Sequence, residues 1–108
     1  MDQIQYIGVN ELKKEEKDIV DDLCTEYYGK LQRMLPGELL LKVRVKQYSK
    51  GGKPKFSIHI RAESPAKVFE TSKDDWDIAR TLHKTFDALM AEIEHAFHRK
   101  SGVKSGKE

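Results

Sequence analysis

The chain has 108 residues, of which 35% are charged and 38% hydrophobic, with 20 Lys and Arg against 18 Asp and Glu. The single cysteine excludes an intramolecular disulfide, and no apolar run approaches the roughly 20 residues of a membrane span. We therefore expect a soluble, cytoplasmic protein without a membrane segment, with one α+β domain over residues 1–100 and a flexible basic tail over residues 101–108.

The first two predicted elements are a short strand over residues 3–9 and a helix that begins at about Leu12. Cys24 is expected to be a small core residue of this helix. Pro36 and Gly37 end the helix. Its apolar residues recur every three or four positions and so share one face: Ile19, Val20, Leu23, Tyr27, Leu31 and Leu35.

The next three predicted elements are strands. Residues 39–48 and 55–62 alternate between apolar and polar or basic side chains, which is the period of a half-buried strand. The turn between them contains two glycines and predicts a β-hairpin. After a break at Ser64 and Pro65, residues 66–71 form a weaker, short strand.

The last predicted element is a long helix. Thr71 and Ser72, followed by Asp74 and Asp75, predict its start, and Trp76 is expected to anchor it in the core. The fold class is therefore α+β, with the order β-α-β-β-β-α and two helices packed on one face of a mostly antiparallel sheet. The apolar stripe of the last helix is Trp76, Ala79, Leu82, Phe86, Leu89, Ile93 and Phe97.

The charges are sorted by segment. Residues 39–67 carry 8 Lys or Arg and 1 acidic residue, whereas residues 1–38 carry 5 against 9 and residues 68–96 carry 3 against 7. Like charges on paired strands repel, so a dense basic face favours a ligand that supplies negative charge, such as the phosphates of RNA. Alternation places six hairpin side chains on the solvent face: Lys42, Arg44, Lys46, Lys55, His59 and Arg61.

Two further features of the basic segment suit RNA. Lys53 lies in the turn, where a basic loop can reach into a groove, and His59 and Tyr48 are candidates to stack on an unpaired base. An alternative stays open, because Lys and Arg also solubilise exposed sheet faces. The protein is then an interaction or regulatory module without an RNA ligand, which binds a protein partner through its acidic helices.

We find no pattern of residues that predicts catalysis. The sequence has no G-x-S-x-G, H-E-x-x-H or Cys-x-x-Cys motif. Glu92 and His95 have the spacing found in carboxylate-bridged metal bundles. Such a site needs a second copy of this pair and two further Glu, and neither is apparent in the sequence. We therefore expect no enzyme activity, no metal and no cofactor.

Three segments together resemble the ribosome hibernation-promoting factors and ribosome-associated inhibitors: residues 4–10 (IQYIGVN), residues 39–62 (LLLKVRVKQYSKGGKPKFSIHIRA) and residues 74–89 (DDWDIARTLHKTFDAL). The resemblance implies the same β-α-β-β-β-α fold and a protein that binds the small ribosomal subunit in the channel of mRNA and tRNA. It implies inhibition of translation by occupancy, without an enzymatic step. The residues that it places on rRNA phosphates are Lys42, Arg44, Lys46, Lys55, Arg61, Arg99 and Lys100.

Overall fold

The computed structural model describes the backbone of residues 3–101 and, apart from positions 50 and 98–101, their side chains. Of the predicted tail over residues 101–108, Ser101 ends the last helix and residues 102–108 lie outside the described part. The predicted element order is confirmed, with one short 3-10 helix in addition: β1 (Ile4–Ile7), η1 (Val9–Glu11), α1 (Lys14–Met34), β2 (Leu40–Lys50), β3 (Lys53–Glu63), β4 (Val68–Asp75) and α2 (Ile78–Ser101).

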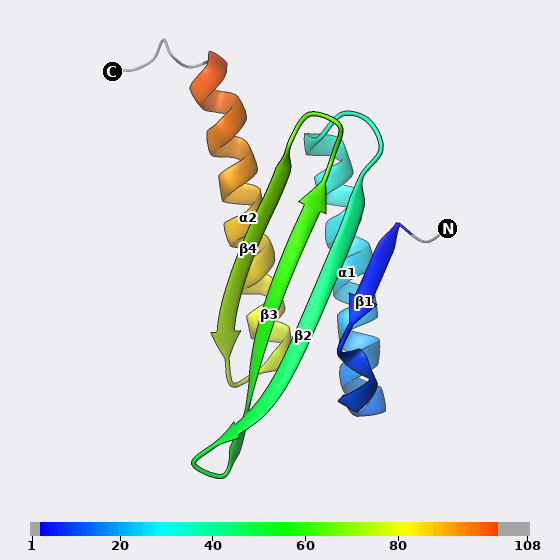
Figure 1. Cartoon of the computed structure of the whole chain (residues 1–108), viewed down its shortest axis with the longest axis vertical. Helices are drawn as coiled ribbons and strands as arrows, with labels where there is room; N and C mark the ends of the chain where they lie inside the picture. Colours follow the sequence, from blue (N-terminus) through cyan, green and yellow to red (C-terminus); the bar gives the residue numbers. More distant parts are fainter. Residues whose placement is uncertain (1–2, 102–108) are drawn as a thin grey trace.

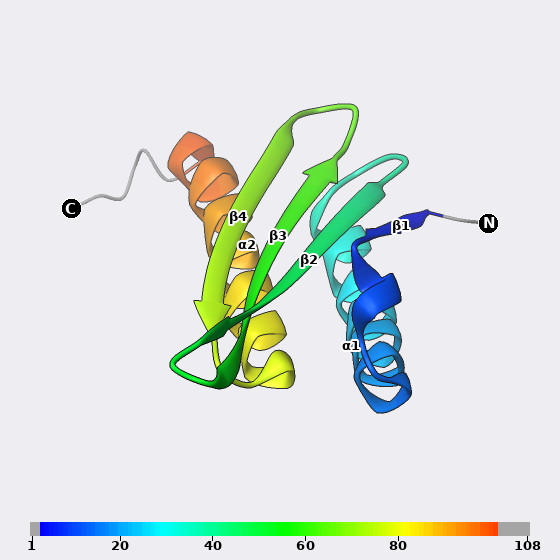
Figure 2. The same ribbon diagram turned by 60° about the horizontal axis from the view of Figure 1, so that its bottom comes forward.

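The four strands form one sheet in the order β1-β2-β3-β4. β1 runs parallel to β2, and the other neighbours are antiparallel. Both helices lie behind the sheet on the same face (Figures 1 and 2), as predicted. No helix in the described part of the chain covers the opposite face, which we call the outer face.

The β2–β3 hairpin is longer than predicted. Its two strands pair from Leu40 with Glu63 to Lys50 with Lys53, so the turn itself has only two residues. These are Gly51 and Gly52, with φ of 62° and 84°. Two positive φ angles match the right-handed twist of the strands and are readily adopted by glycine. The hairpin end projects beyond β4 and both helices (Figure 1).

The core lies between the sheet and the helices. Leu82, Phe86 and Leu89 of α2 are fully buried, as the helical stripe predicts. Cys24 is also fully buried, and burial raises the pKa of its thiol to about 12. No helix in the described part of the chain is long and apolar enough to cross a membrane. The inner row of the hairpin is buried throughout: Leu41, Val43, Val45, Phe56, Ile58 and Ile60.

Gly8 fixes the exit of β1 against the sheet. Its φ is 83°, and a Cβ at this position would clash with the backbone carbonyl oxygen of Val45. Only glycine combines this backbone conformation with such a close approach. The short parallel strand β1 is thereby held against β2 at the edge of the outer face.

The predicted boundary between the strand over residues 66–71 and the last helix was wrong. β4 continues to Asp75, because it pairs with β3 as far as the Phe56–Asp75 pair. α2 begins at Ile78, and the carboxylate of Asp77 accepts a hydrogen bond of 2.9 Å from the backbone N–H of Arg80. Asp77 is thus the capping residue, and Thr71 and Ser72 lie within a strand.

Candidate nucleic-acid interface

Strand register brings the predicted basic side chains together on the outer face. Lys42 lies opposite Arg61, Arg44 opposite His59, and Tyr48 opposite Lys55. Of the nine predicted binding residues, Lys46 and the five in these pairs share one face, and Lys53 adjoins the hairpin turn. The side chains of Arg99 and Lys100, at the end of α2, lie outside the described residues.

One end of this face is neutralised by acidic side chains. Arg61 donates hydrogen bonds of 2.7 Å to Glu63 and 2.6 Å to Glu70. Lys42 is 3.4 Å from Glu63, and His59 Nε2 is 2.8 Å from Glu70. These contacts hold the pKa of both carboxyl groups below the usual range, for Glu63 chiefly through Arg61 and for Glu70 chiefly through His59.

The acidic partners Glu63 and Glu70 were not predicted from the sequence, where the basic residues were interpreted as a cluster of mutually repelling charges. Glu70, Ser72 and Asp74 alternate on the outer side of β4 and stand opposite Arg61, His59 and Ser57 of β3. The period-2 alternation of residues 68–75 was the available signal. It was obscured because a helix start was assigned to the same residues.

Arg44 and Lys46 differ from the other cations. Within the described residues, neither forms an ion pair. Both are exposed, and with Ser57 and His59 they line a shallow hollow of about 200 Å³. The β2 side of the outer face therefore carries positive charge that no described carboxylate neutralises, and it is open to an anionic ligand.

The β4–α2 junction adds an exposed aromatic side chain to the hairpin end of this face. Trp76 is 45% exposed, so its predicted role as a core anchor was wrong. The Lys55 ammonium lies 5.1 Å from the centre of the indole ring, and Tyr48 is 39% exposed. The Tyr48 hydroxyl donates to Asp74 at 3.2 Å.

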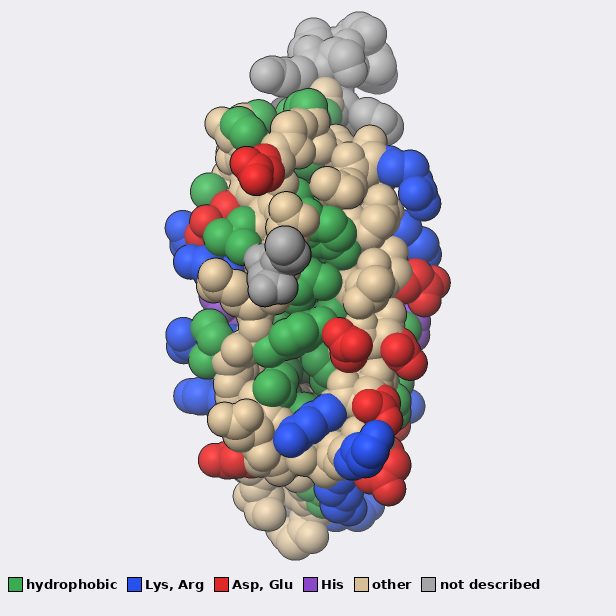
Figure 3. Space-filling model, turned by 90° about the vertical axis from the view of Figure 1, so that its right-hand side faces the viewer, with side chains coloured by type: hydrophobic (Ala, Val, Ile, Leu, Met, Phe, Trp, Pro, Cys, Tyr) green, Lys and Arg blue, Asp and Glu red, His purple; other side chains and the backbone are tan. Residues whose placement is uncertain are grey.

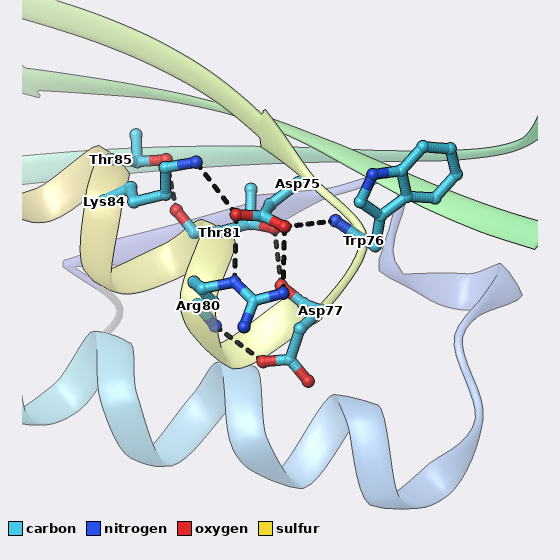
Figure 4. A network of polar contacts seen from close by, with 7 residues as sticks. All are labelled: Asp75, Trp76, Asp77, Arg80, Thr81, Lys84 and Thr85. Atoms are coloured by element: carbon cyan, nitrogen blue, oxygen red, sulfur yellow. Dashed lines mark hydrogen bonds and ion pairs between the residues drawn. The ribbon is translucent and has the colours of Figure 1, made fainter.

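Asp75 fixes this junction (Figure 4). Its carboxylate accepts hydrogen bonds from the backbone N–H of Trp76 at 2.6 Å, from Arg80 Nε at 3.0 Å and from Lys84 Nζ at 2.8 Å. These donors, Arg80 first, hold the pKa of the Asp75 carboxyl far below its usual range. The carboxylate therefore ties the end of β4 to the first turns of α2.

The two sides of the molecule differ in charge. In Figure 3, which faces the β1 edge, Lys and Arg side chains line the left, at the outer face of the sheet, and others lie at the upper right and lower right, among acidic side chains. Asp and Glu side chains are most frequent on the right, over the helices, and hydrophobic side chains run down the middle. A polyanion is therefore attracted to the outer face and repelled by α1.

Comparison with known proteins gives a likeness of fold. The structure is similar to the crystal structure of the Protein Y N-terminal domain from Thermus thermophilus, with a TM-score of 0.65 and 20% sequence identity. The match covers 88% of this chain and 98% of that domain. No protein-family model and no curated protein matches the sequence. At this identity the likeness establishes the shared fold.

Proposed function

We propose that this protein binds RNA of the small ribosomal subunit through the outer face of its sheet. It inhibits translation by occupying its binding site on the subunit. Protein Y, whose N-terminal domain has the same fold, belongs to the ribosome hibernation-promoting factors. The sequence resembles the same family in three segments. The observation that carries the proposal is a pair of exposed cations, Arg44 and Lys46, which have no carboxylate partner among the described residues and lie on a face that no described helix covers.

Phosphate binding explains why such a pair is useful. Each phosphate that a Lys or Arg neutralises releases condensed counterions, so affinity increases and falls steeply with added salt. Arg also presents a planar set of donors that matches phosphate oxygens. Arg44 and Lys46 are the primary phosphate contacts in this proposal, because binding breaks no ion pair between them and the described residues.

The other proposed contacts have secondary roles. Lys53 and Lys55 extend the basic surface towards the hairpin end. Three further residues would exchange their contacts with Glu63 and Glu70 for contacts with RNA: Lys42, His59 and Arg61. Breaking these contacts offsets part of the binding free energy gained from RNA. Arg99 and Lys100 stay proposed contacts outside the described side chains.

The proposed activity has no chemical step. The sequence lacks the nucleophile and metalloprotease motifs considered above, and the structurally similar protein is a non-enzymatic ribosome-associated factor. A protein that acts by occupancy needs only a surface complementary to its site. A protein that binds ribosomes in this way is proposed to act in the cytoplasm.

Co-sedimentation with small ribosomal subunits tests the proposal. We expect saturable pelleting that resists an excess of unrelated RNA and weakens between about 50 mM and about 200 mM salt. Replacing Arg44→Ala together with Lys46→Ala should reduce binding roughly tenfold or more at the lower salt. The matched control is Lys14→Ala with Lys17→Ala, which removes the same charge from α1 and should leave pelleting unchanged.

The alternative function gives a different result. If the acidic helices are the binding surface for a protein partner, the wild-type protein does not pellet with subunits even at the lower salt. A search for a basic protein partner is then the next experiment. Equal pelleting by all three proteins also contradicts the proposed role of Arg44 and Lys46.

A further inference from the structure

An aromatic and basic row crosses the hairpin end of the outer face. Tyr48 of β2 lies directly opposite Lys55 of β3, and the Lys55 ammonium lies 5.1 Å from the centre of the Trp76 ring. Trp76 follows the last residue of β4 and continues its outer row after Asp74. Three neighbouring strands thus each contribute, at or next to their ends, one side chain to a single row.

The exposure of this row is unusual for its residue types. Trp76 is 45% exposed and Tyr48 is 39% exposed, although the indole and phenol rings are among the largest apolar surfaces in the chain. Large exposed aromatic side chains next to cations are typical of binding surfaces for RNA bases. Lys55 forms a cation–π contact with the Trp76 ring. Almost half of the Trp76 surface is nevertheless open to solvent.

The row is also held in place. The Trp76 backbone N–H donates to Asp75, which Arg80 and Lys84 of α2 hold in turn (Figure 4). The Tyr48 hydroxyl donates to Asp74 on the other side of β3. A rigid aromatic surface binds a flat ligand at a lower cost in conformational entropy than a mobile one.

The charges around Trp76 differ from those around Arg44 and Lys46, and the two places suit different parts of a nucleotide, the base and the phosphate. Asp74 and Asp77 flank the junction, and the Lys55 ammonium lies on the indole ring, so the charges next to Trp76 are mixed and the uncharged face of a base is tolerated there. Two strands away, Arg44 and Lys46 have no described carboxylate partner and attract phosphate. The outer face thus separates a phosphate-binding end from an end suited to a base.

We propose that Trp76, with Tyr48 and Lys55, stacks an unpaired base of RNA whose backbone lies on Arg44 and Lys46. This inference rests on the proposed RNA binding and specifies the ligand as single-stranded RNA with an accessible base. Base–aromatic stacking contributes enough binding free energy to change affinity by about 5- to 100-fold per base. Asp75 acts as a positioning residue, because it contacts Trp76 through the backbone.

The chain contains a single tryptophan, so its fluorescence reports on this ring alone. The experiment titrates the full chain with oligouridylate and with an abasic oligomer of the same length, which keeps the phosphates and lacks the bases. We expect oligouridylate to quench Trp76 fluorescence and to bind about 5- to 100-fold more tightly than the abasic oligomer. Both oligomers should lose affinity with added salt.

Variants separate stacking from phosphate binding, with labelled oligomers used to measure affinity. Trp76→Ala should bind both oligomers equally, at the affinity of the wild type for the abasic one, and Trp76→Phe should keep a preference for bases. The matched control is Val68→Ala, because Val68 is 42% exposed and lies at the far end of β4. Thermal unfolding confirms that each variant is folded.

Three outcomes decide the inference. Quenching together with loss of base preference in Trp76→Ala supports stacking. Equal, salt-sensitive binding of both oligomers by the wild type overturns stacking and leaves phosphate binding intact. Binding of neither oligomer overturns the proposed RNA binding, and stacking with it.

Discussion

The β2 and β4 sides of the outer face belong to one sheet, yet they differ in how their charges are satisfied. On the β2 side, Arg44 and Lys46 form no ion pair within the described residues. On the β4 side, Glu70 engages both Arg61 and His59. The count of basic residues in the hairpin therefore overstates the charge available to a ligand, because cross-strand neighbours neutralise part of it.

The largest effect that we expect is on stability, at the buried inner row of the hairpin. Ile58→Ala should lower the free energy of unfolding by roughly 2–5 kcal/mol, because Ile58 is fully buried and truncation leaves a cavity. Urea unfolding measures this change. RNA affinity per folded molecule should stay at the wild-type value. Altered affinity of the folded protein would show that the two faces are not independent.

A smaller effect is expected at Asp75, which ties the β4 side to α2. Its folded pKa is lowered, so its contribution to stability is present above the unfolded pKa of about 4 and is lost progressively as the pH falls below that value. Asp75→Asn should therefore be less stable than the wild type at neutral pH. The difference in free energy of unfolding should shrink in acid.

Urea unfolding at neutral pH and at about pH 3 checks this dependence. The matched control is Asp18→Asn, since Asp18 pairs with Lys14 in a solvent-exposed position, and its effect should be small at both pH values. A loss of stability by Asp75→Asn that is the same at both pH values would contradict the ionic role of the carboxylate.

The smallest expected effect is a gain of binding at the end of the outer face that Glu63 and Glu70 neutralise. Glu63→Gln with Glu70→Gln releases Lys42 and Arg61 from their ion pairs. Affinity for small ribosomal subunits should rise severalfold, and the salt dependence should steepen by about 1 for each cation that gains a phosphate. Co-sedimentation over a range of salt concentrations measures both quantities.

The matched control for this gain is Glu15→Gln with Glu26→Gln, which makes the same change of net charge on α1. It should raise affinity only slightly. Equal gains from the two double substitutions would mean that net charge, rather than the ion pairs of Glu63 and Glu70, controls binding.

The hairpin could be predicted from the sequence because its signals are local. Apolar and basic residues alternate along both strands, and Gly51 and Gly52 permit the tight turn. Since every second side chain faces the same way, the alternation alone placed Arg44 and Lys46 on the face away from the core. The fold class followed from the same patterns and the two helical stripes.

The β4–α2 junction could not be predicted, because its boundary depends on distant residues. Thr71 and Ser72 are good capping residues, but pairing with β3 extends the strand to Asp75. This shift of a few positions moves Trp76 out of the helical stripe and onto the surface. The ion pairs of Arg61 were missed for the same reason, since they require the β3–β4 register.

The salt dependence of binding to small ribosomal subunits tests the role of the β2 side most directly. The slope of log K against log salt should be shallower by about 2 for Arg44→Ala with Lys46→Ala than for the wild type, because two phosphate contacts are lost. Lys14→Ala with Lys17→Ala should keep the wild-type slope. Identical slopes for all three proteins would contradict phosphate binding by Arg44 and Lys46.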